Sequence, residues 1–286
     1  MSHTLLHQML VSDLVVPVGL AHGPGQEYLT AFGTRLSDDT WLRPDMMVFR
    51  EEQAESDLWY IRGAPLLAVE IVSQASRRAD LEVKKALYER YGVPSYWLVD
   101  VVAPEPELIV HELDASGRYA ALTIPWEGSR VLSQPFAIEL APKQIFDPLP
   151  ARIVPTRRGS MSEQNARPAD SAPSETALED VVVAERTFAG PDLPHCEDPI
   201  LLDAFGHRWP TGAEKVELWD GCPVFYGEWD ERDVEIARRA YPGRVVRLDQ
   251  PAGEPGTMTI LPGPGEWPRP AETAPVAEMP RPREAP

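Results

Sequence analysis

This sequence has no long apolar runs, few cysteines, and fewer basic than acidic residues. No apolar stretch approaches the roughly 18 residues that a membrane-spanning helix needs, so the sequence predicts no such helix. The first ten residues, MSHTLLHQML, lack the basic and long apolar segments of a secretory signal. Two cysteines, Cys196 and Cys222, are too few for a disulfide scaffold and suit a reducing compartment. These absences predict a cytoplasmic protein.

The charge balance argues against one class of function. Lys and Arg number 27 and Asp and Glu number 45, which gives a formal net charge of −18. An acidic surface repels the phosphate backbone at long range, so the sequence does not favour a high-affinity, non-specific nucleic-acid binder. A divalent ion and a local basic patch reverse the field at a single site, so a nuclease is not excluded.

Proline and periodicity divide the chain. Of its 31 prolines, 18 follow residue 160, and most of these lie in stretches that lack core-forming residues. The Gly-Ser-Met sequence at 159–161 resembles a fusion joint, which leaves open whether the second half is a natural continuation or a fused chain. Four segments are predicted: a first folded domain at 1–150, a flexible linker at 151–196, a small hairpin-helix segment at 197–250, and a disordered Pro-rich tail at 251–286.

The first segment alternates strands and helices, which predicts an α/β fold. The apolar run LLAVEIVS (66–73) is a central strand, and residues 79–91 form a helix that ends at Gly92. The run SYWLVD (95–100) is the next strand. The second half has a small α+β pattern, with a hairpin at 215–225 that we expect to dock on the first domain at an open sheet edge.

One carboxylate lies inside the apolar strand. Glu70 is flanked by Ala68, Val69, Ile71 and Val72, and an unpaired charge there would cost several kcal/mol. Glu70 is therefore paired, protonated or bound to a cation. A strand with one face in solvent is the simpler alternative, although a strand between two helical layers has no such face.

Two further positions complete the candidate site. Asp45 follows Pro44 at the start of an apolar strand, and Asp80, Lys84 and Tyr88 recur every four residues on one helix face. Either Asp45 or Lys84 alone is more often a turn residue or a solvated lysine. Together with Glu70 they match a Mg²⁺ (or Mn²⁺) site in which carboxylates hold the ion and a lysine assists phosphodiester hydrolysis.

The motifs RPDMMVF, AVEIVS and DLEVKKALYERYGVPSYWLVD resemble the Uma-two family of restriction-endonuclease-like proteins, a branch of the PD-(D/E)xK nucleases. The resemblance covers about residues 40–115. It implies a mixed sheet flanked by helices, with Asp45 and Glu70 as metal ligands and the backbone carbonyl of Ile71 as a third. The same resemblance implies Lys84 as the catalytic lysine. Supporting roles fall to Ser73, Asp80 and Tyr88, although packing is an equally good interpretation of Tyr88.

Two departures from the family pattern stand out. The wider superfamily has its lysine two residues after the glutamate, where this chain has Val72. Family members also begin with a hairpin of the form E-x-x-dG, for which residues 1–16 leave no room. KVELWDGCPVF (215–225) resembles that hairpin, either because the second half supplies the missing piece or by chance.

Two functions from different classes follow. The first is a metal-dependent endonuclease or phosphodiesterase whose substrate is nucleic acid, with DNA preferred and a homodimer left open. The second is a catalytically weak or inactive relative that acts as a protein-binding or regulatory partner. The acidic charge, the missing hairpin and the Pro-rich tail favour the second.

Overall fold

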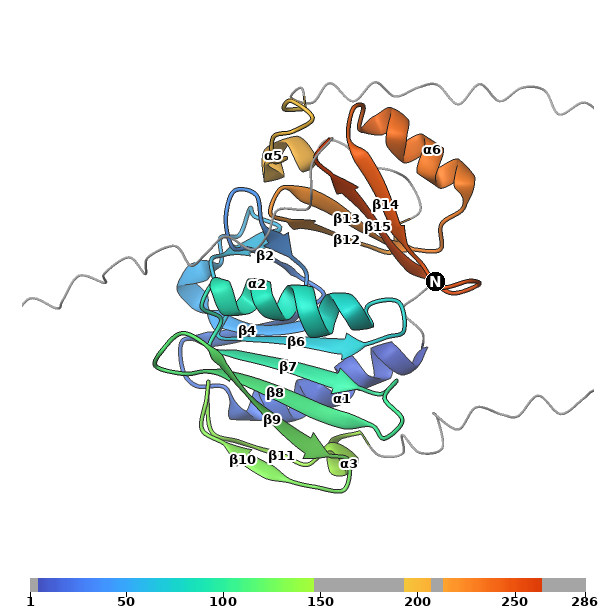
Figure 1. The fold of residues 1–286 in the computed structure, drawn as a ribbon. Coiled ribbons are helices and arrows are strands. Elements are labelled where there is room, and N and C mark those ends of the chain that lie inside the picture. Colours follow the sequence, from blue (N-terminus) through green and yellow to red (C-terminus); the bar gives the residue numbers. More distant parts are fainter. Residues whose placement is uncertain (1–4, 147–192, 207–212, 264–286) are drawn as a thin grey trace, which may run out of the picture.

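A computed structural model describes residues 5–146, 193–206 and 213–263 as two large β-sheets and a separate two-stranded one, with helices packed against them (Figure 1). Within these residues, no helix is long and apolar enough to cross a membrane.

The first sheet has six strands in the order β1-β4-β6-β7-β8-β9. Its central strands β6 and β7 are parallel, and every other neighbouring pair is antiparallel. The bounds are β1 Gln26–Thr30, β4 Met46–Arg50, β6 Leu67–Val72, β7 Ser95–Asp100, β8 Glu107–Leu113 and β9 Tyr119–Pro125.

Helices cover both faces of this sheet (Figure 1). Helix α1 (Leu5–Ala21) packs on one face, where Val69 and Ile71 of β6 join its core. On the other face, the π-helical turn η2 (Ala79–Lys84) continues into α2 (Lys85–Arg90), whose core includes Ala68 and Val72. Because side chains alternate along a strand, Glu70 points to the same face as Ala68 and Val72, toward η2 and α2. The predicted mixed sheet flanked by helices is confirmed.

The second sheet combines strands from both halves of the chain. Its order is β14-β15-β13-β12-β3-β2-β5, with only β2 and β5 parallel among neighbours. The bounds are β2 Gly33–Arg35, β3 Trp41–Leu42, β5 Tyr60–Arg62, β12 Lys215–Trp219, β13 Cys222–Gly227, β14 Val245–Asp249 and β15 Gly256–Leu261.

The two halves meet where β12 pairs with β3. Leu218 is the register partner of Trp41, and both side chains lie in one buried core with Phe225, Met258 and Ile260. That core contains residues from both halves, so apolar burial as well as backbone pairing holds the second half against the first.

The turn between β12 and β13 is fixed to its surroundings. Asp220 and Gly221 both have positive φ, of 48° and 74°, as a tight hairpin turn requires. A Cβ on Gly221 would lie 2.3 Å from the Cβ of Pro199, so no larger residue fits. The Asp220 carboxylate accepts a hydrogen bond from the Arg90 guanidinium at the end of α2. The hairpin is thereby held in one position relative to α2.

The remaining elements are short. They are the 3₁₀ turn η1 (Glu51–Gln53), the β10–β11 hairpin (Arg130–Leu132 and Ile138–Leu140), α3 (Pro142–Ile145), α5 (Leu202–Phe205) and α6 (Glu231–Ala240). Asp230 caps the N-terminus of α6, because its side chain accepts hydrogen bonds from the backbone N–H groups of Arg232 and Asp233.

Part of the predicted disordered tail is wrong. Residues 256–261 form β15, which pairs on both sides with β13 and β14 and buries Met258 and Ile260. Two-sided pairing satisfies the backbone of a short strand that proline and glycine flank. Residues 193–196, at the end of the predicted linker, are also described. The rest of both predictions, residues 151–192 and 264–286, lies outside the described residues.

Candidate active site

Asp45 directly precedes β4 and lies beside β6. Its backbone N–H donates to the carbonyl of Val69 at 3.0 Å, and its Oδ2 accepts from the N–H of Ile71 at 2.8 Å. The Nε2 of His7, on α1, lies 3.0 Å from the same oxygen. Burial alone would raise the pKa of Asp45, but the ammonium of Lys215 and the contact with His7 outweigh it and hold the pKa well below its usual value. Asp45 is therefore ionised at neutral pH.

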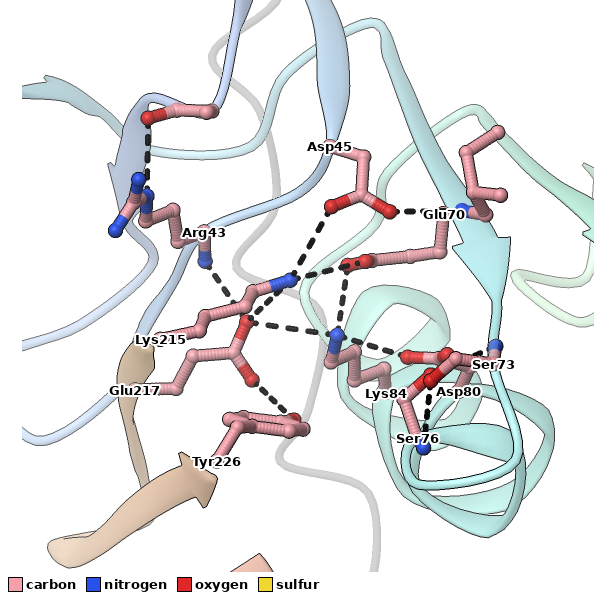
Figure 2. A network of polar contacts seen from close by, with 12 residues as sticks. Arg43, Asp45, Glu70, Ser73, Ser76, Asp80, Lys84, Lys215, Glu217 and Tyr226 are labelled. Carbon is pink, nitrogen blue, oxygen red and sulfur yellow. Dashed lines mark hydrogen bonds and ion pairs between the residues drawn. The ribbon is translucent and has the colours of Figure 1, made fainter. Parts of the chain in front are cut away.

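Glu70 is 1% exposed and contacts two ammonium groups (Figure 2). Its Oε1 lies 2.9 Å from the Nζ of Lys84, and its Oε2 lies 3.1 Å from the Nζ of Lys215. Burial raises the pKa of Glu70, although both ammonium groups oppose this shift. The hypothesis that Glu70 meets solvent is wrong, because the side chain is enclosed and ion-paired.

Lys84 is fully buried among carboxylates. Besides Glu70, its Nζ lies 2.8 Å from Oδ1 of Asp80, one helical turn earlier, and 3.5 Å from Oε1 of Glu217. Burial lowers the pKa of Lys84, but Asp80, Glu217 and Glu70 raise it well above its usual value. The surrounding carboxylates therefore favour the charged form of Lys84 and hold its ammonium at the centre of the cluster.

The second half contributes four side chains to the same place. Lys215 Nζ lies 3.7 Å from Asp45 Oδ1 and 3.5 Å from Glu217 Oε1, in addition to its contact with Glu70. Glu217 accepts hydrogen bonds from Tyr226 Oη at 2.8 Å, from Trp219 Nε1 at 3.0 Å and from the backbone N–H of Arg43 at 3.1 Å. The hairpin that resembles the family's missing element therefore lies against the predicted site (Figure 2).

Sequence reasoning did not identify His7, Lys215, Glu217 or Tyr226. One signal was available for two of them, because Lys215 and Glu217 occupy alternate positions of an otherwise apolar strand and so share one face. Nothing in the local sequence relates that face to Glu70, which precedes Lys215 by 145 residues.

Of the predicted supporting residues, Asp80 contacts the charged cluster directly, whereas Tyr88 and Ser73 have other neighbours. Asp80 pairs with Lys84, whereas the Tyr88 hydroxyl has no hydrogen-bond partner within the described part of the chain and its ring packs 4.8 Å from that of Tyr96. Ser73 Oγ lies 2.9 Å from Ser76 Oγ, in the loop after β6. Ile71 directs its backbone to the edge occupied by Asp45, because alternate residues of a strand point their N–H and C=O groups to the same side.

The buried cluster is short of positive charge. Four carboxyl groups, of Asp45, Glu70, Asp80 and Glu217, face two ammonium groups, of Lys84 and Lys215. Burial raises the pKa of Asp80 as well as that of Glu70. A divalent cation would supply the missing charge, and carboxylate and carbonyl oxygens are the ligands that Mg²⁺ prefers.

The arrangement of possible metal ligands is less favourable to a divalent ion than the charge of the cluster is. Among the described residues, no three His, Cys, Asp or Glu side chains gather as a ready-made metal site. The Lys215 ammonium lies between Asp45 and Glu70, where the oxygens of both carboxylates converge (Figure 2). The residues fit a divalent ion in charge and ligand type, with Lys215 as a competing cation.

One cavity adjoins the cluster, and a second lies beside the first. A small one of about 50 Å³ is lined by His7, Asp45, Glu70, Ser73, Lys215 and Tyr226, among others. A larger one of about 350 Å³ is lined by Arg78, Arg247, Gln74, Trp219 and Thr257, among others. Ala75 lines both, so the larger cavity lies beside the smaller one.

Comparisons with known proteins bear on the first half. The family model Uma2, described as "putative restriction endonuclease", matches residues 2–143. A crystal structure of a "putative nuclease belonging to DUF820" from Anabaena variabilis ATCC 29413 is similar with a TM-score of 0.41 and 17% sequence identity, over 50% of this chain and 81% of that one. No curated protein matches the chain at a significant level.

The matched segment contains Asp45, Glu70 and Lys84, and it spans α1, the whole first sheet and the start of α3. Lys215 and Glu217 lie outside it. The N-terminal half of this chain, residues 2–143, belongs to the Uma2 family.

Proposed function

We propose that this chain is a metal-dependent nuclease that hydrolyses phosphodiester bonds in nucleic acid, with DNA as the expected substrate. The observation that carries the proposal is the convergence of Asp45 and Glu70 on one cation. Both carboxylates lie within 3.7 Å of the same Lys215 ammonium, and Lys84 lies 2.9 Å from Glu70. Two acidic residues beside a buried lysine suit metal-assisted phosphodiester hydrolysis, in which carboxylates hold the ion and a lysine offsets negative charge.

Each residue has a distinct role in this proposal. Asp45 and Glu70 hold the ion through carboxylate oxygens, and the Ile71 carbonyl is the third ligand. When bound, such an ion acidifies a water molecule and offsets charge on the phosphate. Lys84 offsets the negative charge that develops on the scissile phosphate, and Asp80 keeps its ammonium oriented.

The larger cavity supports a path for the substrate strand. Arg78 and Arg247 line it, and both contact Asp249. Guanidinium groups bind phosphate through planar, paired hydrogen bonds, so they are suited to a nucleotide adjoining the scissile one. We place the neighbouring phosphates of the substrate in this cavity, where they would replace Asp249 as the partner of the two arginines.

A cleavage assay tests the proposal. Wild-type protein, Asp45→Ala and Glu139→Gln, an exposed carboxylate on β11, are incubated with single- and double-stranded DNA and RNA in Mg²⁺ or Mn²⁺. We expect metal-dependent cleavage by the wild type and by Glu139→Gln, and none by Asp45→Ala. Cleavage that persists in Asp45→Ala would show that the activity arises elsewhere.

One observation favours a second candidate function. The Lys215 ammonium already satisfies Asp45 and Glu70, which suits a metal-free relative that binds a partner without hydrolysis. In that case nucleic acid or protein would bind equally well with EDTA and with Mn²⁺, and no substrate would be cleaved.

A further inference from the structure

Lys215 is the first residue of β12, and this end of the strand lies beside the candidate site. The residue opens β12, and its register partner is Tyr226 on β13, whose ring centroid lies 5.6 Å from the ammonium. Its side chain is 10% exposed, whereas that of Lys84 is 0% exposed. Of these two lysines, only Lys215 lines the small cavity.

The contacts of Lys215 use the oxygens that a metal would need. Its Nζ lies 3.1 Å from Glu70 Oε2 and 3.7 Å from Asp45 Oδ1. A divalent ion bound by these carboxylates would bring its oxygen ligands to about 2.1 Å. An ammonium and a divalent cation cannot share that space, because like charges at such separations repel strongly in a buried site.

We propose that Lys215 is a tethered counter-cation, which neutralises Asp45 and Glu70 in the metal-free protein and which the divalent ion must displace. This inference rests on the proposed function, because it assumes that those two residues hold the ion. Metal occupancy and the position of the Lys215 side chain are then coupled, so the second half of the chain regulates metal binding in the first.

The neighbours of Lys215 provide for such an exchange. Glu217 Oε1 lies 3.5 Å from its Nζ and is held by the backbone N–H of Arg43, so one carboxylate partner remains when the ammonium leaves Glu70. The partly exposed side chain also borders the cavity through which it would withdraw. Lys84 has no such freedom, because Asp80, Glu70 and Glu217 surround it.

Calorimetric titration with MnCl₂ tests the proposal on the full-length protein. The variants are Lys215→Met, which keeps much of the apolar stem without the charge, and Lys143→Met, a control at an exposed lysine paired with Glu127. We expect Lys215→Met to bind Mn²⁺ at least about tenfold more tightly than the wild type, equivalent to a gain of at least about one unit in pKd. Lys143→Met should bind like the wild type.

A second measurement needs no variant and covers the case in which Lys215→Met does not fold. Wild-type protein is labelled with an amine reagent, with and without saturating Mn²⁺, and the labelled lysines are quantified by mass spectrometry. We expect the labelling rate of Lys215 to rise severalfold with Mn²⁺. Lys84 should stay protected, and Lys143 should react rapidly in both states.

The outcomes separate the two proposals. Equal or weaker Mn²⁺ binding by folded Lys215→Met, or unchanged labelling of Lys215 in metal-bound wild type, overturns the role of Lys215 and leaves the metal site standing. Absence of Mn²⁺ binding by both wild type and Lys215→Met overturns the metal site itself, and the role of Lys215 with it.

Discussion

The Nζ of Lys215 lies 3.1 Å from Oε2 of Glu70, although 145 residues separate them in the chain. Lys215 belongs to β12 of the second sheet and Glu70 to β6 of the first. The contact ties a strand outside the family-matched segment to a carboxylate inside it. Any account of this site therefore involves both halves of the chain.

Metal binding should be visible as a change in stability. An ion that binds only the folded state at 100 times its dissociation constant stabilises it by about 2.7 kcal/mol, so saturating Mn²⁺ should raise the Tm by several degrees. Glu70→Gln should abolish this rise, because it removes one of two charged ligands. Glu139→Gln is the matched control and should respond like the wild type. A full Mn²⁺ response in Glu70→Gln would place the ion elsewhere.

Lys84→Met should destabilise the protein by about 3–5 kcal/mol, because it leaves Asp80, Glu70 and Glu217 without their shared ammonium. Lys85→Met is the control, since Lys85 is half-buried and follows directly in the chain. It should cost less than about 1 kcal/mol. Urea unfolding of the three proteins measures both values, and equal stabilities of the two variants would contradict the central position of Lys84.

His111 should make stability fall in mild acid. Burial lowers its pKa to about 4, helped by Lys85 and opposed by Glu89. Between the ordinary value near 6.5 and about 4, the unfolded chain binds a proton that the folded chain does not, so stability decreases as pH falls through this window. The loss has an upper bound of about 3 kcal/mol.

His111→Phe provides the comparison. It keeps a ring against Tyr96, and Nδ1 of His111 has no hydrogen-bond partner among the described residues to lose. Urea unfolding between pH 4 and pH 7 should show a shallower decline for the variant. The prediction fails if the two curves are parallel.

Alanine substitutions at two glycines with nearly equal φ distinguish the cost of a steric clash from the cost of backbone strain. Gly221 and Gly253 have φ of 74° and 76°, but a Cβ at Gly221 meets Pro199 whereas a Cβ at Gly253 meets nothing within 4 Å. Gly253→Ala should cost about 1 kcal/mol from the positive φ alone. Gly221→Ala should cost more and should also reduce cleavage, because it displaces the hairpin that carries Lys215 and Glu217. Equal costs in thermal unfolding would remove the steric argument.

Arg247→Gln should weaken nucleic-acid binding if substrate phosphates lie in the larger cavity. Fluorescence anisotropy with a labelled oligonucleotide, in an Asp45→Ala background, should show a lower affinity and a smaller dependence on salt concentration. Arg130→Gln changes an exposed arginine on β10 and should have no effect. Identical salt dependence for Arg247→Gln and its parent would place the substrate outside this cavity.

The central strands of the first sheet and the candidate residues Glu70, Asp80 and Lys84 were predictable because their signals are local. Buried parallel strands appear as short apolar runs, and helix α2 with η2 appears as a segment without Gly or Pro that ends at Gly92. A charged residue inside such an apolar run is unusual, and for this reason Glu70 was identified as a candidate site residue. The spacing of Asp80 and Lys84 then places both on the helix face that packs against the strand.

The tail was mispredicted for a related reason. The run Met258-Thr-Ile-Leu261 is short, and proline and glycine flank it on both sides. Composition over a wide window therefore favoured disorder. The strand β15 exists because β13 and β14 provide pairing on both sides, and no local pattern announces those partners.

By itself, the sequence determined the central strands of the first sheet and the helix between them, because backbone propensity and side-chain period act over a few residues. It also determined that Glu70 needs a partner, since a buried carboxylate without one is too costly. Only the tertiary structure decided what that partner is. The pairing of Leu218 with Trp41 and the shared core beneath it bring Lys215 and Glu217 to Glu70. Contacts between residues so far apart depend on packing of the whole chain, which leaves no periodic trace in the sequence.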